Sequence, residues 1–251
     1  MRLHKIIYCL FLLIPTYSVA AEEVTVIFES GFGVDGEVWN PVIEQLPTNI
    51  KVINPTRLSL ASANTQPTTI QQDVSSLIKK IQRESEQRQV IVVGHSYGGL
   101  IVTEAIREAS SQVLGVVLIE PTVKVQRVRY RKLDSERVAR DDKMMAKYMP
   151  PHLLPHYKLL MQELDSTDEN LIPLPADLRV TLYTSTQLHP EPMFIEETKA
   201  GKELWMQMHN ELFSLIRAGQ HIRSDKWGHS IHIEYPAEIA NAILNLAAEG
   251  P

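Results

Sequence analysis

A serine between glycines follows a run of β-branched residues near the middle of the chain. Residues 90–99 read Val-Ile-Val-Val-Gly-His-Ser-Tyr-Gly-Gly, and a helical pattern of apolar residues begins at Leu100. This strand, sharp turn and helix form the arrangement called a nucleophile elbow, in which the hydroxyl of Ser96 stands clear of the backbone. Gly94 and Gly98 lack Cβ atoms, so the strand and the helix can approach each other closely. Ser96 is therefore the candidate nucleophile.

A serine hydroxyl is a poor nucleophile near neutral pH. It needs a base within hydrogen-bond reach and a group that orients the base. His229 follows the last predicted strand and precedes the last predicted helix, which puts it at the carboxyl end of the sheet beside Ser96. His232 is the alternative base, but the glycine before His229 lets that loop turn and favours the earlier residue.

Two carboxylates are the main candidates for the group that orients the imidazole. Glu120 directly follows the apolar run 114–119, whereas the run 179–184 is followed by no carboxylate before Glu191. A catalytic imidazole needs a carboxylate that is fixed at a strand end, which favours Glu120 over Glu191. Asp225 lies close to the histidine in sequence and is a third alternative.

Apolar runs that alternate with helical patterns must position these side chains, and they predict a parallel sheet covered by helices on both faces. The fold class is thus α/β with a mostly parallel sheet. The predicted strands are 24–28, 50–53, 90–93, 114–119, 179–184 and 221–224. The predicted helices are 37–46, 70–81, 99–109, 204–216 and 236–246. A polar loop is expected at 56–67, and Thr69 with Gln72 forms a capping box after it.

The alternation stops between Pro121 and Pro175. Helical patterns at 136–149 and 153–164, separated by prolines, predict a small helical cap inserted at about 122–176. Many basic residues lie between 124 and 147, and such runs usually form a solvated helix face. If this run instead rims a pocket, it would favour an anionic substrate.

The first 21 residues predict a secretory signal peptide. Basic residues precede an apolar run at 6–14, and the small residues at 18–21 suit cleavage after Ala20 or Ala21. The apolar run is too short to span a bilayer, and no later stretch is long and apolar enough to do so. The mature chain is then one domain, residues 22–251, that is secreted or periplasmic.

Charge and cysteine usage restrict the possible partners and cofactors. Cys9 is the one cysteine and lies within the predicted signal, so the mature chain would contain no thiol and no disulfide. Removal of the signal leaves 30 acidic residues against 23 basic ones and a net charge of about −7, which argues against nucleic acid as the main partner. His152, His156 and His189 show no metal-ligand spacing, so no metal or other cofactor is expected.

Three segments resemble the α/β-hydrolase superfamily. They are the loop 30–33 (Ser-Gly-Phe-Gly), the elbow at 94–99, and Gly-His at 228–229 before a helix that starts with proline. The resemblance spans about residues 24–249 and implies the α/β-hydrolase fold, with the cap where that superfamily carries one. It also implies that Ser96 is the nucleophile and His229 the general base. The backbone N–H groups of Phe32 and Tyr97 would form the oxyanion hole.

Two departures from the superfamily pattern concern the first loop and the acid. The usual His-Gly of the loop is Ser30-Gly31 here, which leaves open how firmly the loop is held. The common Asp after the strand 179–184 is missing. A minority of relatives place the acid one strand earlier, which is the position of Glu120.

The resemblance implies a serine hydrolase that acts on a carboxylic ester or a related small acyl compound. A thioesterase, a peptidase or an acyltransferase could use the same triad, because the cap decides what enters. A non-catalytic ligand-binding protein on this scaffold is the alternative from a different class, and the two departures support it.

Overall fold

The computed structural model describes residues 23–57 and 66–249. The predicted signal peptide at residues 1–21 lies outside this part of the chain, as does most of the loop predicted at 56–67. Across the two described ranges, no helix combines the length and the apolar character that crossing a bilayer requires.

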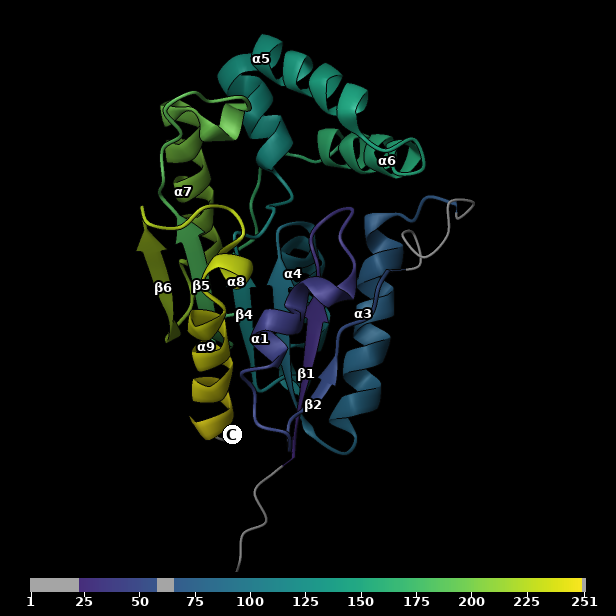
Figure 1. The fold of residues 1–251 in the computed structure, drawn as a ribbon, viewed down its shortest axis with the longest axis vertical. Helices are drawn as coiled ribbons and strands as arrows, with labels where there is room; N and C mark the ends of the chain where they lie inside the picture. The colour runs from purple at the N-terminus through teal and green to yellow at the C-terminus, as the bar shows by residue number, and fades with distance from the viewer. Residues whose placement is uncertain (1–22, 58–65, 250–251) are drawn as a thin grey trace, which may run out of the picture.

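Six parallel strands of the described chain form one sheet, in the order β2-β1-β3-β4-β5-β6 (Figure 1). They are β1 (Val24–Glu29), β2 (Lys51–Ile53), β3 (Gln89–His95), β4 (Gly115–Ile119), β5 (Arg179–Ser185) and β6 (Ala218–Ser224). The predicted α/β class with a parallel sheet is confirmed. The edge strand β6 begins at Ala218, before the predicted His221. Its first residues are exposed and carry no apolar pattern, so the sequence does not reveal them as part of the strand.

Helices cover both faces of the sheet (Figure 1). Along the chain they are η1 (Gly36–Trp39), α1 (Asn40–Ile43), α3 (Ile70–Ser85), α4 (Tyr97–Ala109), η2 (Ser110–Gln112), α5 (Gln126–Tyr148), α6 (Leu154–Asp165), η3 (Ile195–Glu197), α7 (Lys199–Phe213), α8 (Ile231–Glu234) and α9 (Pro236–Glu249). The predicted capping box begins α3: Gln72 N donates to Thr69 Oγ1 at 3.2 Å, and Thr69 N donates to Gln72 Oε1 at 2.9 Å. α7 begins before the predicted residue 204, because Thr198 caps it.

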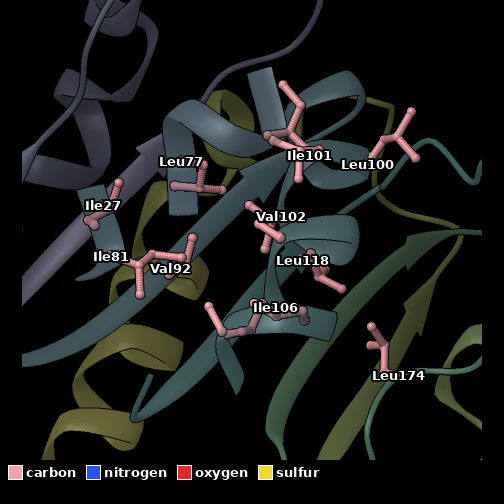
Figure 2. Close-up of a cluster of buried hydrophobic side chains, with 14 of the residues drawn as sticks. Ile27, Leu77, Ile81, Val92, Leu100, Ile101, Val102, Ile106, Leu118 and Leu174 are labelled. Carbon is pink, nitrogen blue, oxygen red and sulfur yellow. The ribbon is translucent and has the colours of Figure 1, made fainter. Parts of the chain in front are cut away.

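Residues of the central strands alternate between two hydrophobic clusters, one on each face of the sheet. Val90 and Val92 of β3 share a cluster with α3 and α4, whereas Ile91 and Val93 share one with α1 and α9. Figure 2 shows the first cluster, in which side chains of α3 and α4 meet those of the central strands. Burial on both faces explains why these strands read as continuous apolar runs.

The cap consists of α5 and α6, which lie beyond the carboxyl ends of the strands (Figure 1). Two helices are observed where two are predicted, but α5 begins at Gln126 rather than near residue 136. The first part of α5 is rich in arginine and lysine and has no apolar period, so the sequence pattern does not reveal it.

A sharp kink at Asp134 folds α5 back on itself. The backbone of Asp134 is non-helical, with φ −158° and ψ 92°, and its Oδ1 accepts a hydrogen bond from Arg137 N at 2.9 Å. Asp134 thus caps the second half of the helix. Along a straight helix Arg127 and Asp142 would be roughly 22 Å apart, yet they form an ion pair at 2.8 Å. The two halves of α5 therefore lie side by side.

Two arginines of the basic run hold the cap together. Arg127 pairs with Asp142 at 2.8 Å and with Asp165 of α6 at 2.9 Å, and Arg131 pairs with Asp165 at 2.6 Å. Burial alone would raise the pKa of Asp165, but hydrogen bonds from Arg131 and Arg127 lower it to about 2. This part of the basic run is therefore engaged in ion pairs rather than forming a solvated face.

A buried chain of hydrogen bonds joins α7 to β5 and β6. His209 Nε2 lies 2.9 Å from Pro121 O, and Thr184 Oγ1 lies 2.7 Å from His209 Nδ1 and 2.8 Å from His221 Nε2. Because a carbonyl only accepts, His209 carries its proton on Nε2, and its Nδ1 accepts from the hydroxyl of Thr184. Burial lowers the pKa of His209 and of His221 to about 4, so both are neutral at pH 7.

The buried His209 should make the folded chain sensitive to acid. The pKa of a histidine in an unfolded chain is about 6.5, whereas burial lowers the pKa of His209 in the fold to about 4. Between these values the unfolded chain binds a proton that the folded chain does not, so the free energy of unfolding falls as pH falls. We expect His209→Gln to reduce the loss between pH 7 and pH 4.5 by about 2 kcal/mol, measured by urea unfolding. An equal loss in parent and variant would contradict this, and His152→Gln, at an exposed histidine, is the control.

Candidate active site

Ser96 occupies a sharp turn between β3 and α4. Its backbone has φ 51° and ψ −121°, with a positive φ that residues other than glycine rarely adopt. Ser96 N donates to Ile119 O of β4 at 3.1 Å, and Thr122 N donates to Ser96 O at 2.9 Å. The neighbouring strand and the loop after it therefore hold the turn. α4 begins at Tyr97, directly after the serine, rather than at the predicted residue 99.

Glycine is required at both flanks of this turn. A Cβ at Gly98 would lie 2.1 Å from Glu29 O and 2.5 Å from Ser30 O, and a Cβ at Gly94 would lie 2.8 Å from Gly98 O. Each distance is shorter than a van der Waals contact, and each contacted atom belongs to the backbone. A side chain at either position would therefore push the turn away from α4 or from the loop that follows β1.

Glu120 directly follows β4 and has a second unusual backbone conformation, with φ 46°. Its carboxylate is buried and accepts hydrogen bonds at Oε1 from Ser185 N at 2.7 Å and from Trp205 Nε1 at 3.2 Å. Its Oε2 lies 3.4 Å from His229 Nδ1. Burial alone would raise the pKa of Glu120, but the hydrogen bond and the charge of His229 outweigh it and lower the pKa. Glu120 is therefore ionised at pH 7.

His229 lies in the loop between β6 and α8, as the sequence predicts. With Nδ1 facing Glu120, its Nε2 is the nitrogen left for the cavity that it shares with Ser96. His95 Nε2 lies 3.0 Å from His229 O, and the centroids of the two imidazole rings are 4.7 Å apart. Burial and the neighbouring histidines hold the pKa of His95 well below its usual value, so neutral His95 donates to the carbonyl. His95 thus packs against His229 and supports the loop that carries it.

The alternative base, His232, is packed inside the fold. Its ring lies 4.6 Å from that of Trp39 and 4.3 Å from that of His95, and burial lowers its pKa to about 4. The cavities that contain Ser96 are lined by His229 and not by His232. Of His229 and His232, His229 is therefore the one that shares these cavities with Ser96.

The two alternative acids lie elsewhere on the surface. Glu191 is exposed, and its backbone contacts the ring of His189, with Nδ1 of that ring 2.8 Å from Glu191 O. Asp225 is also exposed. Among the candidate carboxylates it is Glu120 that contacts the imidazole of His229.

Phe32 and Tyr97 line one cavity together with Ser96 and His229. The N–H of Tyr97 belongs to the first turn of α4, where backbone amides have no partner within the helix. The loop that carries Phe32 is anchored through Ser30, whose Oγ accepts from Trp39 Nε1 at 3.0 Å and donates to Asp35 O at 3.0 Å. Both residues predicted to supply the oxyanion donors thus line a cavity that also contains Ser96.

The cavity that contains Phe32 and Tyr97 has a volume of about 460 Å³ and lies between the elbow and the cap. Apolar side chains dominate its wall, including Val138, Met145, Leu160, Met161 and Ile195. A second cavity of about 370 Å³ shares Ser96 and His229 but is lined mainly by polar and charged residues, including Gln187, His189, Glu197 and Lys202. A hollow of about 560 Å³ between β6 and α9 is larger, but it contains none of the predicted site residues.

Arg127 is the residue of the basic run that reaches the apolar cavity. Its charge is balanced by Asp142 and Asp165, and Asp141 also lines the cavity. The hypothesis that the basic run favours an anionic substrate is therefore not supported. Within the residues that the structure describes, no group of three or more His, Cys, Asp or Glu side chains is arranged to hold a metal ion.

Sequence reasoning missed the two donors that fix Glu120. Ser185 stands at the strand end where the superfamily commonly has its acid, and here its backbone N–H binds Glu120 instead. Trp205 is separated from Glu120 by 85 residues, and nothing near it in sequence indicates the contact. Its position depends on the packing of α7, which a local pattern cannot predict.

Comparisons with known proteins agree with this architecture. Residues 26–242 match the model of the alpha/beta hydrolase family. The Bacillus subtilis protein YqjL is 21% identical to this chain, over 89% of this chain and 83% of its own length. Lipase LipV of Mycobacterium tuberculosis is 30% identical, over 43% of this chain and 41% of its own length. A thermophilic esterase of Thermogutta terrifontis shares the fold, with a TM-score of 0.57 and 14% identity over 91% of both chains. The chain belongs to the alpha/beta hydrolase family.

Proposed function

We propose that this chain is a serine hydrolase that cleaves a carboxylic ester or a related acyl compound through an acyl-enzyme. In this proposal Ser96 is the nucleophile, His229 the general base and Glu120 the acid that orients the base. The observation that carries it is the contact of Glu120 Oε2 with His229 Nδ1 at 3.4 Å, beside cavities that His229 shares with Ser96. Relatives named as a lipase and an esterase support the same class of reaction.

The reaction begins when Ser96 Oγ attacks the acyl carbon and passes its proton to His229 Nε2. The N–H groups of Phe32 and Tyr97 donate to the oxyanion that forms on the former carbonyl oxygen. His229 then gives its proton to the leaving oxygen as the bond to the alcohol breaks. Water, deprotonated by His229, attacks the acyl-enzyme, and the proton returns to Ser96 as the acid leaves.

Glu120 supports this sequence through its charge and its fixed position. Its Oε1 is held by Ser185 N and Trp205 Nε1, which leaves Oε2 for His229 Nδ1. An ionised carboxylate at Nδ1 keeps the proton of the neutral imidazole on that nitrogen and stabilises the imidazolium that forms during attack. Because Glu120 provides this contact, the missing Asp after β5 is no argument for a non-catalytic binding protein.

The two cavities divide the substrate in this proposal. The oxyanion donors Phe32 and Tyr97 line the apolar cavity, so the carbonyl group lies there and its acyl chain extends toward the cap. The polar cavity then receives the leaving group beside His229. We therefore propose an ester with an apolar acyl chain of moderate length and a polar alcohol, small enough to enter beneath the cap.

The proposed signal peptide determines where the enzyme would act. Residues 1–21 would direct the chain out of the cytoplasm and be removed after Ala20 or Ala21, so the enzyme would act in the periplasm or outside the cell.

Removal of the Ser96 hydroxyl should abolish the reaction. We expect kcat/KM of the parent to rise from p-nitrophenyl acetate to the hexanoate, because the longer chain fills the apolar cavity. Ser96→Ala should lower kcat/KM by several orders of magnitude on each ester and prevent labelling by a fluorophosphonate. Ser214→Ala, at an exposed serine, is the control. A folded Ser96→Ala protein as active as the parent would refute the mechanism, whereas a folded parent that is neither active nor labelled would favour a ligand-binding protein.

Glu120→Gln should leave the shape of the site intact but reverse the polarity of one contact. Ser185 N and Trp205 Nε1 retain an acceptor only if the amide oxygen faces them. The amide nitrogen then donates to His229 Nδ1 and moves the imidazole proton to Nε2, where it blocks general-base catalysis. We expect kcat to fall by roughly 10³- to 10⁴-fold.

The matched control for this variant is Glu191→Gln, which removes the exposed alternative acid and should leave kcat within about twofold of the parent. Measured side by side on one ester, a large loss in Glu191→Gln with none in Glu120→Gln would show that the acid has been misassigned.

A further inference from the structure

The loop that carries Phe32 is held by a buried arginine from another part of the chain. Arg57 follows β2, and its side chain is only 8% exposed. Its Nη1 donates to Ser30 O at 2.7 Å, and its Nη2 donates to Gly31 O. One planar guanidinium thus binds two consecutive carbonyl groups of the loop.

The second of these contacts sets the direction of an oxyanion donor. The carbonyl of Gly31 and the N–H of Phe32 belong to one trans peptide plane, so they point in opposite directions. When Gly31 O is fixed on Arg57, the N–H of Phe32 must point away from the arginine. Phe32 lines the cavity that contains Ser96, which is where this N–H is needed.

Arg57 also contacts the residue that carries the other donor. Its guanidinium carbon lies 5.1 Å from the ring centroid of Tyr97, within the range of a cation–π interaction. The hydroxyl of Tyr97 donates to Asp73 at 2.7 Å, so the ring is fixed at both its face and its tip. One side chain therefore contacts the peptide group that contains the N–H of Phe32 and the ring of Tyr97.

The charge of Arg57 is balanced without involving the loop. Glu29 accepts from Arg57 Nη1 at 3.4 Å through Oε2 and pairs with Lys80 at 3.0 Å through Oε1. Lys80 thus shares the carboxylate with Arg57, but it contacts Glu29 and not the loop carbonyls. This difference allows the carbonyl contacts to be tested separately from the ion pair.

We propose that Arg57 is a positioning residue that aligns the N–H of Phe32 to bind the oxyanion and packs against the side chain of Tyr97, the residue that carries the other proposed donor. This inference rests on the proposed serine-hydrolase function. Arg57 acts on the transition state while leaving ground-state binding of the ester unchanged.

The test compares Arg57→Met, Arg57→Lys and the control Lys80→Met on p-nitrophenyl hexanoate. Loss of one oxyanion donor typically lowers kcat by about 10²- to 10³-fold, and we expect Arg57→Met to lower kcat by about 10²-fold with KM within about threefold of the parent. A lysine at this position can reach one carbonyl but not both, so the kcat of Arg57→Lys should lie between those of the parent and Arg57→Met. Lys80→Met should keep kcat within about threefold.

A second readout does not depend on activity. Hydrogen exchange of the peptide that covers residues 29–35 should become faster in Arg57→Met and stay unchanged in Lys80→Met. If the parent neither hydrolyses esters nor reacts with a fluorophosphonate, the proposed function fails, and this exchange still shows whether Arg57 holds the loop.

Three results would overturn the proposal. The first is a folded Arg57→Met protein that keeps the parent's kcat. The second is an equal loss of kcat in Lys80→Met, which would assign the effect to the charge on Glu29. The third is unchanged exchange of residues 29–35 in Arg57→Met. If Arg57→Met does not fold, Arg57→Lys decides the question through the same kcat and exchange measurements.

Discussion

Two residues with unusual backbone conformations, at the ends of neighbouring strands, determine the geometry of the site. Ser96 and Glu120 are the described residues other than glycine with positive φ, at 51° and 46°. Each such conformation costs on the order of 1–3 kcal/mol and persists only where the surroundings impose it. Here the sheet does so, because Ser96 N donates to Ile119 O at 3.1 Å and Glu120 N donates to Tyr183 O at 2.9 Å. At Ser96 and at Glu120 the backbone therefore turns out of the sheet, at the two positions that carry the proposed nucleophile and acid.

The remaining groups are fixed by contacts between segments that lie far apart in sequence. Glu120 is held by β5 and α7, His229 by Glu120 and His95, and the first loop by Arg57. Dipoles that are already oriented need not reorganise when charge develops, which is the main source of catalytic power in sites of this kind. The buried cores on both faces of the sheet supply the rigidity that such preorganisation needs (Figure 2).

Much of this architecture could be predicted from sequence, because strands buried on both faces must be apolar throughout and the elbow requires small residues at fixed positions. The order of strands in the sheet could not be predicted in the same way. The sequence therefore leaves Glu120 and Glu191 as alternatives, whereas the structure places β4 between β3 and β5 and Glu120 against His229. The first half of α5 was missed because ion pairs, not an apolar stripe, stabilise it. Arg57 and Trp205 act through contacts that have no local signal.

The crystal structure of the chain after reaction with an alkyl fluorophosphonate would test the proposed site most directly. We expect phosphorus to be bonded to Ser96 Oγ and one phosphonyl oxygen to lie about 2.7–3.1 Å from the backbone nitrogens of both Phe32 and Tyr97. His229 should remain against Glu120 with Nε2 turned toward the adduct. An adduct on another residue, or a phosphonyl oxygen directed away from both amides, would contradict the proposed mechanism.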